Sequence, residues 1–571
     1  MLKHNSSRRN CKKSIYNKPH RTLFLLLGIL FSSNLYAQDG GGFLDGNTNR
    51  LVLFLLIGTL SIILIGILFF TDRLLKVTAE KVRSDIGKPE LDEEEDEGYS
   101  VLPSFNEIFP SQKSIHPYAG SDTIIKTEKG MDIRIKGRSK KVVKNDFVSE
   151  TYAINPKDFV GLKPIPKLHV SEGDEVKAGD PLFFDKSRPD VNYTSPVSGE
   201  VIEIRRGAKR AIEEIVILAD KEINFREFTK ANPTDLSREQ VIKSLLESGA
   251  WAFLRQRPFN LTANPEDKPK AIFISGFKSA PLAPNYNFIM EGKQHDFQTG
   301  INALNKLTEG KVHLNLTADR KPSKTYTEAK NVQINWFSGP HPAGNVGIQI
   351  HHLDPINKGE VVWVINPQDV VIIGRLFNEG IYNTKKMMVA AGPTIKQPTY
   401  FESYIGANVK GIINDNLELE NSRIVSGDVL SGKSIEKDGY IGFYSDMVSV
   451  LEEGDFYEFL GWLLPSYARP SLSKTFPWKF FPQEEFEVNT NTHGERRAFV
   501  VTGQYEEVLP MDIYPQQLLK AIMVRDYELI EGLGIYEVAE EDLALCEFVC
   551  TSKIPVQEIL KEGLDFIREQ E

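Results

Sequence analysis

The chain has 571 residues, 26% of them charged, and a formal net charge of −10. This length exceeds a single domain and predicts about three or four of them with ample core. The mildly acidic balance excludes a global attraction to nucleic acid, and three cysteines (Cys11, Cys546 and Cys550) exclude a disulfide framework.

Residues 1–37 resemble a secretory signal. Basic residues precede the short apolar run Thr22–Phe31, and small residues follow it before Gln38, with a cleavage point near Ala37. An uncleaved anchor stays open as the alternative, although the apolar run is short for a span.

Residues 38–83 predict a membrane anchor. The run Leu51–Phe70 has twenty residues and no charge, which is typical of a transmembrane helix. Lys and Arg gather after it, at positions 73, 76, 81 and 83, so the positive-inside rule places the main body on the cytoplasmic side of the membrane. The span holds no ionisable residue, and we therefore expect an anchor and no ion path.

Residues 84–123, with the acidic run Glu90–Glu97, predict a solvated linker. Residues 124–225 then show the EGDxVxxGDxL and SPVSGxV pattern of a biotinyl- or lipoyl-like hammerhead. Such carriers need a lysine at the hairpin tip, which we expect at Ser187–Asp190, with Lys186 one residue before it. The segment therefore predicts a scaffold, and a true biotin carrier remains an alternative.

Residues 226–385 alternate apolar strands and amphipathic helices, as a Rossmann-like doubly wound sheet requires. Ser237 and Gln240 predict a capping box, and 271–277, 311–316, 332–337, 361–366 and 387–391 predict strands. No GxGxxG or GxxxxGK[ST] loop follows any of them, and Pro340 and Pro342 remove amides from the nearest glycine-rich segment. The domain is expected to lack a nucleotide loop.

Residues 386–445 show short strands with glycine turns, which predict a β-grasp-like module. Residues 446–571 predict a helical domain, with one helix from Pro515 and a last helix through Val556 and Leu564. The fold class is thus multidomain α/β and α+β, with one N-terminal transmembrane helix.

Six segments together resemble the NqrA family, the A subunits of sodium-translocating NADH:quinone reductases. They are IIKTEKGMDIRIKG (124–137), SPVSGEVIEIRRGAKRAI (195–212), GAWAFLRQRPF (249–259), GPHPAGNVGIQIHHLDPI (339–356), VLPMDIYPQQLLKAIMVRD (508–526) and EEDLALCEFVC (540–550). The resemblance begins near Ile124, so residues 1–123 stand outside it as an added tether. It implies a β-grasp module of the SLBB type and an architecture related to the NADH-oxidising flavoprotein subunit of complex I and to RnfC.

The resemblance further implies a component of a bacterial respiratory translocase that couples NADH oxidation and quinone reduction to Na⁺ export. It implies that this chain binds no tight cofactor, and that NADH, flavins, iron–sulfur clusters and quinone are used in partner subunits. The expected partners are the other subunits, the membrane-embedded B subunit above all, with the membrane through the chain's own helix and quinone as a further candidate. No nucleic acid is expected.

Few residues qualify as a site. His341 and His351 are candidates for a quinone pocket. No metal site is predicted, because the adjacent residues His351 and His352 should point to opposite faces of an extended chain. No catalytic residue is predicted. Cys546 and Cys550 stand four apart, yet two thiolates cannot hold an iron–sulfur cluster alone.

The competing interpretation is a membrane-fusion adaptor of an efflux pump, which also joins one span to a lipoyl-like module. That class needs an extracytoplasmic body and a long helical hairpin between the lipoyl halves. Here about a dozen residues separate the halves, and the flanking charges place the body inside.

Overall fold

The computed structural model describes residues 56–61, 63, 67, 117–119, 124–144, 147–162, 165–458, 469–470, 472 and 485–570. The chain divides into two units, Met1–Pro110 and Ser111–Glu571. In the first, the described residues 56–61, 63 and 67 are helical. No helix among the described residues has the length and apolar character needed to cross a membrane. Most of the predicted span 51–70, the signal-like segment, Cys11 and the acidic run lie outside the described residues.

A seven-stranded sheet organises the second unit. Its order is β1-β14-β13-β12-β15-β10-β11, parallel from β1 to β15 and antiparallel beyond. The strands are β1 (Ile124–Lys126), β14 (Gln333–Ser338), β13 (Lys311–Thr317), β12 (Ala271–Ser275), β15 (Val362–Val364), β10 (Arg255–Arg257) and β11 (Leu261–Thr262). The predicted doubly wound sheet is present, but β1 joins its edge, whereas the sequence pattern assigned Ile124 to the hammerhead.

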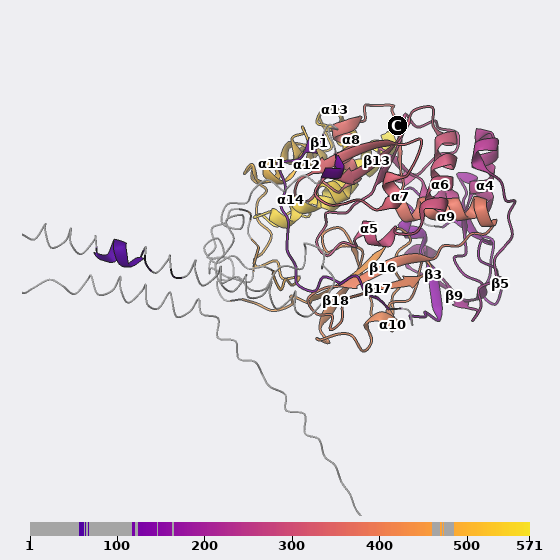
Figure 1. The fold of residues 1–571 in the computed structure, drawn as a ribbon, viewed down its shortest axis with the longest axis horizontal. Helices are drawn as coiled ribbons and strands as arrows, with labels where there is room; N and C mark the ends of the chain where they lie inside the picture. Colours follow the sequence, from indigo (N-terminus) through magenta and orange to yellow (C-terminus); the bar gives the residue numbers. More distant parts are fainter. Residues whose placement is uncertain are drawn as a thin grey trace, which may run out of the picture. The chain divides into compact units, whose positions relative to one another are not determined.

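Helices cover both faces of this sheet (Figure 1). They are α4 (Arg238–Ser248), α6 (Gln294–Leu307), α8 (Val346–Leu353) and α9 (Pro367–Glu379), with the short helices α5 (Tyr286–Ile289) and α7 (Lys324–Thr327). The capping box of Ser237 and Gln240 begins α4, and Gly249 ends it in the left-handed conformation. On one face, Val346 and Ile350 of α8 pack against Ala271 and Phe273 of β12.

Two small antiparallel sheets form the hammerhead. One has the order β3-β9-β8-β5 (Thr151–Ile154, Ile212–Ala219, Gly199–Arg206, Glu175–Val176), and the other β4-β6-β7 (Lys167–Leu168, Pro181–Asp185, Arg188–Thr194). Asp185 pairs with Arg188, so the tip of the β6–β7 hairpin is the two-residue turn Lys186–Ser187. The predicted tip at Ser187–Asp190 is therefore wrong, because Arg188 to Asp190 already belong to the returning strand.

A six-stranded sheet forms the third part, in the order β19-β18-β20-β16-β17-β2. These strands are Lys433–Ile435, Ser422–Ser426, Met447–Glu452, Lys386–Ala391, Thr399–Ser403 and Val143–Lys144, and α10 (Lys410–Ile413) follows β17. The strand predicted at 387–391 pairs with β20 and β17, as the predicted boundary at residue 386 requires, and its inclusion among the strands of the doubly wound sheet was wrong. Strand β20 lies beyond the predicted boundary at 445.

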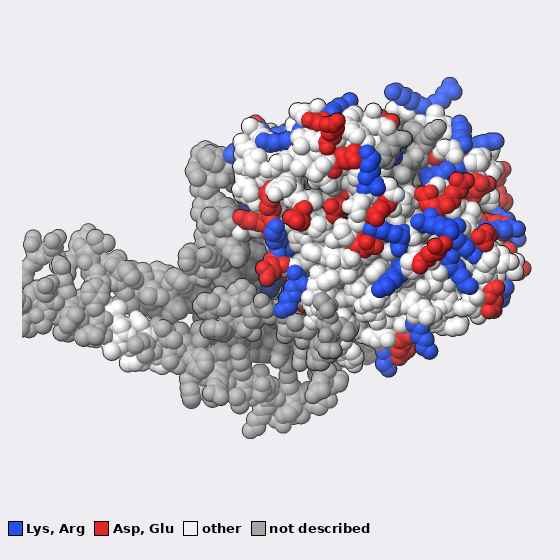
Figure 2. All heavy atoms as spheres, turned by 90° about the horizontal axis from the view of Figure 1, so that it is seen from above, with Lys and Arg blue, Asp and Glu red and all other residues white. Residues whose placement is uncertain are grey.

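The C-terminal part is helical, as predicted. Its helices are α11 (Gln504–Val508), α12 (Pro515–Val524), α13 (Tyr527–Gly532), α14 (Ala544–Val549) and α15 (Val556–Gln570). Figure 1 shows α11, α12 and α14 gathered near α8, which packs on the large sheet. On the face that Figure 2 shows, Lys and Arg are interspersed with Asp and Glu, so neither sign forms a continuous field over it.

Candidate functional site

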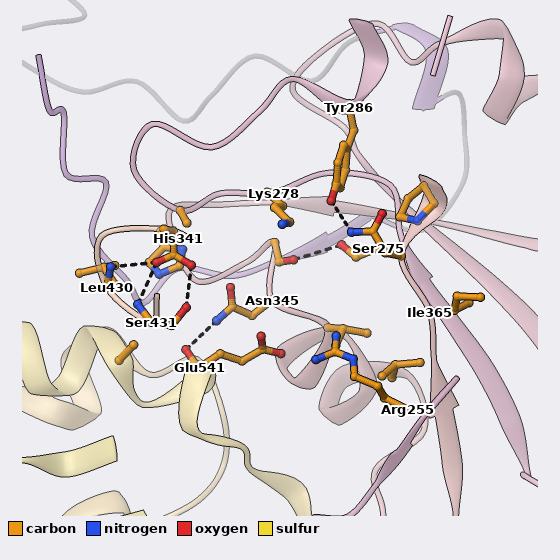
Figure 3. A pocket seen from close by; sticks show the side chains of 18 residues that line it. Arg255, Ser275, Lys278, Tyr286, His341, Asn345, Ile365, Leu430, Ser431 and Glu541 are labelled. Carbon is orange, nitrogen blue, oxygen red and sulfur yellow. Dashed lines mark hydrogen bonds between the residues drawn. The ribbon is translucent and has the colours of Figure 1, made fainter. Parts of the chain in front are cut away.

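The large sheet has a topological switch point between β12 and β15. From β12 the chain winds outward to β13 and β14, and then returns to the other side of β12 as β15. In open α/β sheets ligands bind at the carboxyl ends of the strands where this reversal occurs. A cavity of about 120 Å³ lies there, beside Ser275 at the end of β12 and Val364 at the end of β15 (Figure 3).

Three parts of the chain wall this cavity. The sheet contributes Arg255, the six-stranded module contributes the turn at Asp428, and the helical part contributes Glu541. The volume is below the roughly 300–1,000 Å³ of pockets for drug-sized ligands. It is close to the roughly 150 Å³ engineered cavity that takes benzene. The cavity itself is therefore smaller than a pocket that encloses a whole nucleotide.

The first turn of α8 lies against a carboxylate of the chain itself. Asp542 is fully buried, and its Oδ2 stands 2.1 Å from the point where a Cβ on Gly347 would be. Gly347 lies in the first turn of α8, whose amides and dipole favour negative charge. Asp542 thus fills the space beside Gly347 that a side chain at position 347 would need.

An ion pair and a hydrogen bond hold this segment in place. Arg257, 3% exposed, binds Glu541 at 2.7 Å and approaches Asp542 at 3.9 Å. The side-chain amide of Asn345, just before α8, donates to the Glu541 carbonyl at 2.9 Å. Burial raises the pKa of Asp542 from 3.8 to about 7, against the lowering effect of Arg257. The contact joins the helical part to the sheet through α8.

His341 lies on the cavity wall and is 3% exposed. Its backbone N–H donates to Asp132, and its Nδ1 lies 3.0 Å from Ser279 Oγ. Ser279 Oγ also accepts the Gly344 amide at 2.8 Å. In the tautomer in which Ser279 donates to Nδ1, Nε2 carries the ring proton; in either tautomer Nε2 has no partner among the described residues. Burial lowers the pKa of His341, which keeps the ring neutral.

A buried charge network lies above the cavity. Lys278 binds Asp446 at 2.7 Å, and Asp446 also accepts the Tyr286 hydroxyl, which in turn accepts Asn366 at 2.5 Å. Asp446 is 2% exposed. Although burial opposes ionisation, Lys278 holds the pKa of Asp446 below its ordinary value. The network fixes the β12–α5 loop over the strand ends.

Comparison with known proteins gives the family. Family models match residues 125–220 (NqrA N-terminal barrel-sandwich hybrid domain), 236–382 (NqrA second alpha/beta domain) and 388–437 (NQRA C-terminal domain). The A subunit of the Na(+)-translocating NADH-quinone reductase of Photorhabdus laumondii is 38% identical over 452 residues, which are 78% of this chain and 100% of the relative. The chain belongs to this family.

Other relatives agree. The corresponding A subunits of Rhodopirellula baltica and Vibrio anguillarum are 36% and 38% identical, over 79% and 78% of this chain and 100% of their own lengths. Among solved structures, an NAD⁺-reducing nickel–iron hydrogenase in the air-oxidised state aligns with TM-score 0.32 and 11% identity, over 60% of this chain and 62% of that one. A likeness this weak carries no argument.

The second histidine candidate of this NqrA family member lies apart from the cavity lining. His351 and His352 are on α8 and not on an extended chain, as was wrongly expected, and their ring centroids are 5.3 Å apart. His351 Nδ1 lies 2.6 Å from Glu537, and Nε2 accepts the Asp512 amide at 3.0 Å. His351 therefore offers a ligand no free ring nitrogen. Among the described residues, no cluster of three or more His, Cys, Asp or Glu could hold a metal.

The cysteines of this NqrA family member are packed in its core. Cys546 is 1% and Cys550 3% exposed, and Cys550 Sγ accepts the Tyr505 hydroxyl at 2.9 Å. Burial raises the pKa of the Cys546 thiol. A buried, protonated thiol is neither a ready nucleophile nor a ready metal ligand.

The hammerhead hairpin is fixed. Arg188 donates to the Thr262 carbonyl at 2.8 Å, and Tyr193 lies within hydrogen-bond distance of Thr262 at 3.2 Å. Buried Asp185 accepts both the amide and the hydroxyl of Ser187, which shapes the turn. Lys186 is exposed at the tip. A hairpin held on the neighbouring sheet cannot swing as a carrier arm does.

The sequence prediction missed three features of the site. They are the contact of Asp542 with Gly347, the guanidinium of Arg255 on the cavity wall, and the Lys278–Asp446 ion pair. The motif EEDLALCEFVC drew attention to its cysteines, although Asp542 is its structural centre. The only local sequence feature that pointed to the contact with Asp542 was the glycine in the first turn of α8, Gly347.

Proposed function

We propose that this chain is the non-redox docking A subunit of a membrane complex that couples NADH oxidation and quinone reduction to Na⁺ export. Family membership supports the assignment to the complex. The observation that supports the non-redox part is the buried carboxylate of Asp542, which packs against Gly347 in the first turn of α8 and joins the helical part to the sheet. The efflux-adaptor alternative has no support among the relatives.

The redox groups then belong to other subunits. The small size of the switch-point cavity, about 120 Å³ with Glu541 on its wall, supports this part of the proposal. The chain instead supplies three rigid surfaces: the fixed hammerhead, the doubly wound sheet and the helical part. The B subunit in the membrane is the proposed main partner. The N-terminal segment with the run Leu51–Phe70 is the proposed anchor in the bacterial cytoplasmic membrane, with the body on the cytoplasmic side.

A contribution to quinone binding is the finer part of the proposal. With both ring nitrogens of His351 engaged, it rests on His341, whose Nε2–H could donate to a quinone oxygen. A His341→Phe complex should then show a raised KM for quinone with an unchanged rate of NADH oxidation by an artificial acceptor.

Affinity purification of the complex through this chain tests the central proposal. Flavin-bearing partners and Na⁺-stimulated quinone reductase activity should co-purify, while the chain separated from them should carry neither flavin nor iron. Absence of that activity from the purified assembly, or a flavin that stays with the isolated chain, would refute the assignment.

A further inference from the structure

The cavity at the switch point presents hydrogen-bond donors that the protein leaves unused. The first is His341 Nε2, which is buried on the cavity wall, has no partner among the described residues and is a donor in the tautomer in which Nδ1 accepts from Ser279. A buried donor without a partner destabilises the folded protein. Such a group retained in a cavity points to a ligand that accepts its hydrogen.

The second donor is the guanidinium of Arg255. It lies over the ring of Tyr444, with the guanidinium carbon 5.1 Å from the centroid, and makes no hydrogen bond or ion pair with any residue that the structure describes. Figure 3 shows its guanidinium extended toward the cavity. The neighbouring Arg257, by contrast, is paired with Glu541. Arg255 is thus the cation of this wall that is available to a ligand.

The third donor group is the start of α8. Asn345 precedes the helix but gives no side-chain cap, because its amide is bound to the Glu541 carbonyl. The amides of the first turn therefore lack the partner that an N-cap supplies. Asp542 covers the Gly347 side, and Val346 lines the cavity at the start of the helix, whereas the amides of Gly344 and Asn345 are bound to Ser279 Oγ and to the Pro342 carbonyl.

The carboxylates of the wall are already engaged. Asp428 accepts the amides of Leu430 and Ser431 at 2.9 and 3.0 Å and the Ser431 hydroxyl at 2.6 Å. Glu541 is bound to Arg257. What the wall offers a ligand is therefore one cation, one imidazole N–H and helix amides, which is the donor set of an oxyanion site.

We propose that this cavity binds one small oxyanion, a phosphate or a short carboxylate, between Arg255 and His341 Nε2. The volume of about 120 Å³ takes a group of a few heavy atoms and excludes a nucleotide. The site would join the sheet, the six-stranded module and the helical part, since each contributes to the wall. The proposal stands apart from the role of the chain in the complex.

Calorimetric titration of the purified full-length chain in detergent with inorganic phosphate tests the site. One phosphate per chain should bind saturably at pH 7.5, and Arg255→Gln should weaken binding at least tenfold. Arg206→Gln, which removes the same charge from the exposed β8–β9 hairpin, is the matched control and should bind as the parent does. No saturable binding, or equal affinity in Arg255→Gln, would overturn the proposal.

A second measurement does not depend on the Arg255 variant folding well. The ³¹P line of phosphate should broaden with the parent chain, and malonate should narrow it again by competition if carboxylates share the site. Failure of malonate to compete would assign the site to phosphate. Competition by a neutral benzoquinone headgroup, with affinity unchanged in Arg255→Gln, would identify the cavity as a quinone site and reject the oxyanion.

Discussion

Gly347 and Asp542 lie so close that a methyl group on Gly347 would stand 2.1 Å from the Asp542 carboxylate oxygen. The two residues are nearly 200 positions apart in sequence, and their contact closes the helical part onto the doubly wound sheet. Because Gly347 has no side chain, the Asp542 carboxylate of the same chain fits against the first turn of α8.

Gly347→Ala should therefore destabilise the protein. The added methyl group forces Asp542 and its Arg257 partner to shift, at a cost of about 1–3 kcal/mol. Urea unfolding followed by tryptophan fluorescence measures the change. Gly532→Ala, at a helical glycine with open space around its Cβ position, is the matched control and should cost far less. If the double variant Gly347→Ala/Asp542→Ala shows no coupling in free energy, the contact is not the cause.

Asp542 should also give the stability a pH dependence. Its pKa rises from 3.8 to about 7 on folding, so its contribution is complete below about pH 4 and is lost as the pH rises through 7. Asp542→Asn cannot titrate. The melting temperature of the parent relative to this variant should therefore fall between pH 5 and pH 8. Arg257, Glu541 and Glu540, which face Asp542, are present in both proteins, so the comparison isolates Asp542. A constant difference across this range would contradict the raised pKa.

Much of the fold could be predicted from periodicity and turn chemistry. The helix between Ser237 and Gly249 follows from its capping box and its glycine stop, and β12 follows from an uninterrupted apolar run. These signals are local, because caps and half-buried faces are fixed by neighbours in sequence. The strand 386–391 has the same apolar character as β12, so composition alone could not tell which sheet it would join.

The site depends on contacts that no local pattern encodes. Arg255 and Arg257 are two residues apart and alike in sequence, yet one is paired with Glu541 and the other faces the cavity. The same holds for the hairpin tip. Because Asp185 pairs with Arg188, Lys186 lies in the turn, whereas a tip at Ser187–Asp190 would have left Lys186 just before it. Register is set by packing, which a single sequence does not reveal.

Removal of Lys278 should destabilise the protein through Asp446. Lys278→Met leaves a carboxylate that is 2% exposed without its cation, at a cost on the order of 3 kcal/mol. The double variant Lys278→Met/Asp446→Leu removes both charges and should recover most of the loss in chemical unfolding. A double variant as unstable as the sum of both single variants would show that the pair does not act as a unit.

Lys186 should be unmodified despite its place at the hairpin tip. The hairpin is held by Arg188 on Thr262, so a swinging arm has no freedom there. Mass spectrometry of the peptide that contains Lys186 should show neither biotin nor lipoate, and Lys186→Ala should leave assembly unchanged. Arg188→Ala, in contrast, should lower the free energy of unfolding by about 1–2 kcal/mol, because a charged hydrogen bond is lost. Streptavidin binding by the purified chain would contradict this prediction.

Deletion of residues 1–120 should separate anchoring from assembly. The family models begin at residue 125, and the Photorhabdus laumondii relative matches over its full length while covering 78% of this chain. A chain without the extension should therefore no longer sediment with membranes when expressed alone, yet should join the complex when the partners are present. Co-purification of flavin-bearing subunits with the shortened chain measures this. Loss of those partners would show that the N-terminal segment contributes to assembly, which an anchor alone would not do.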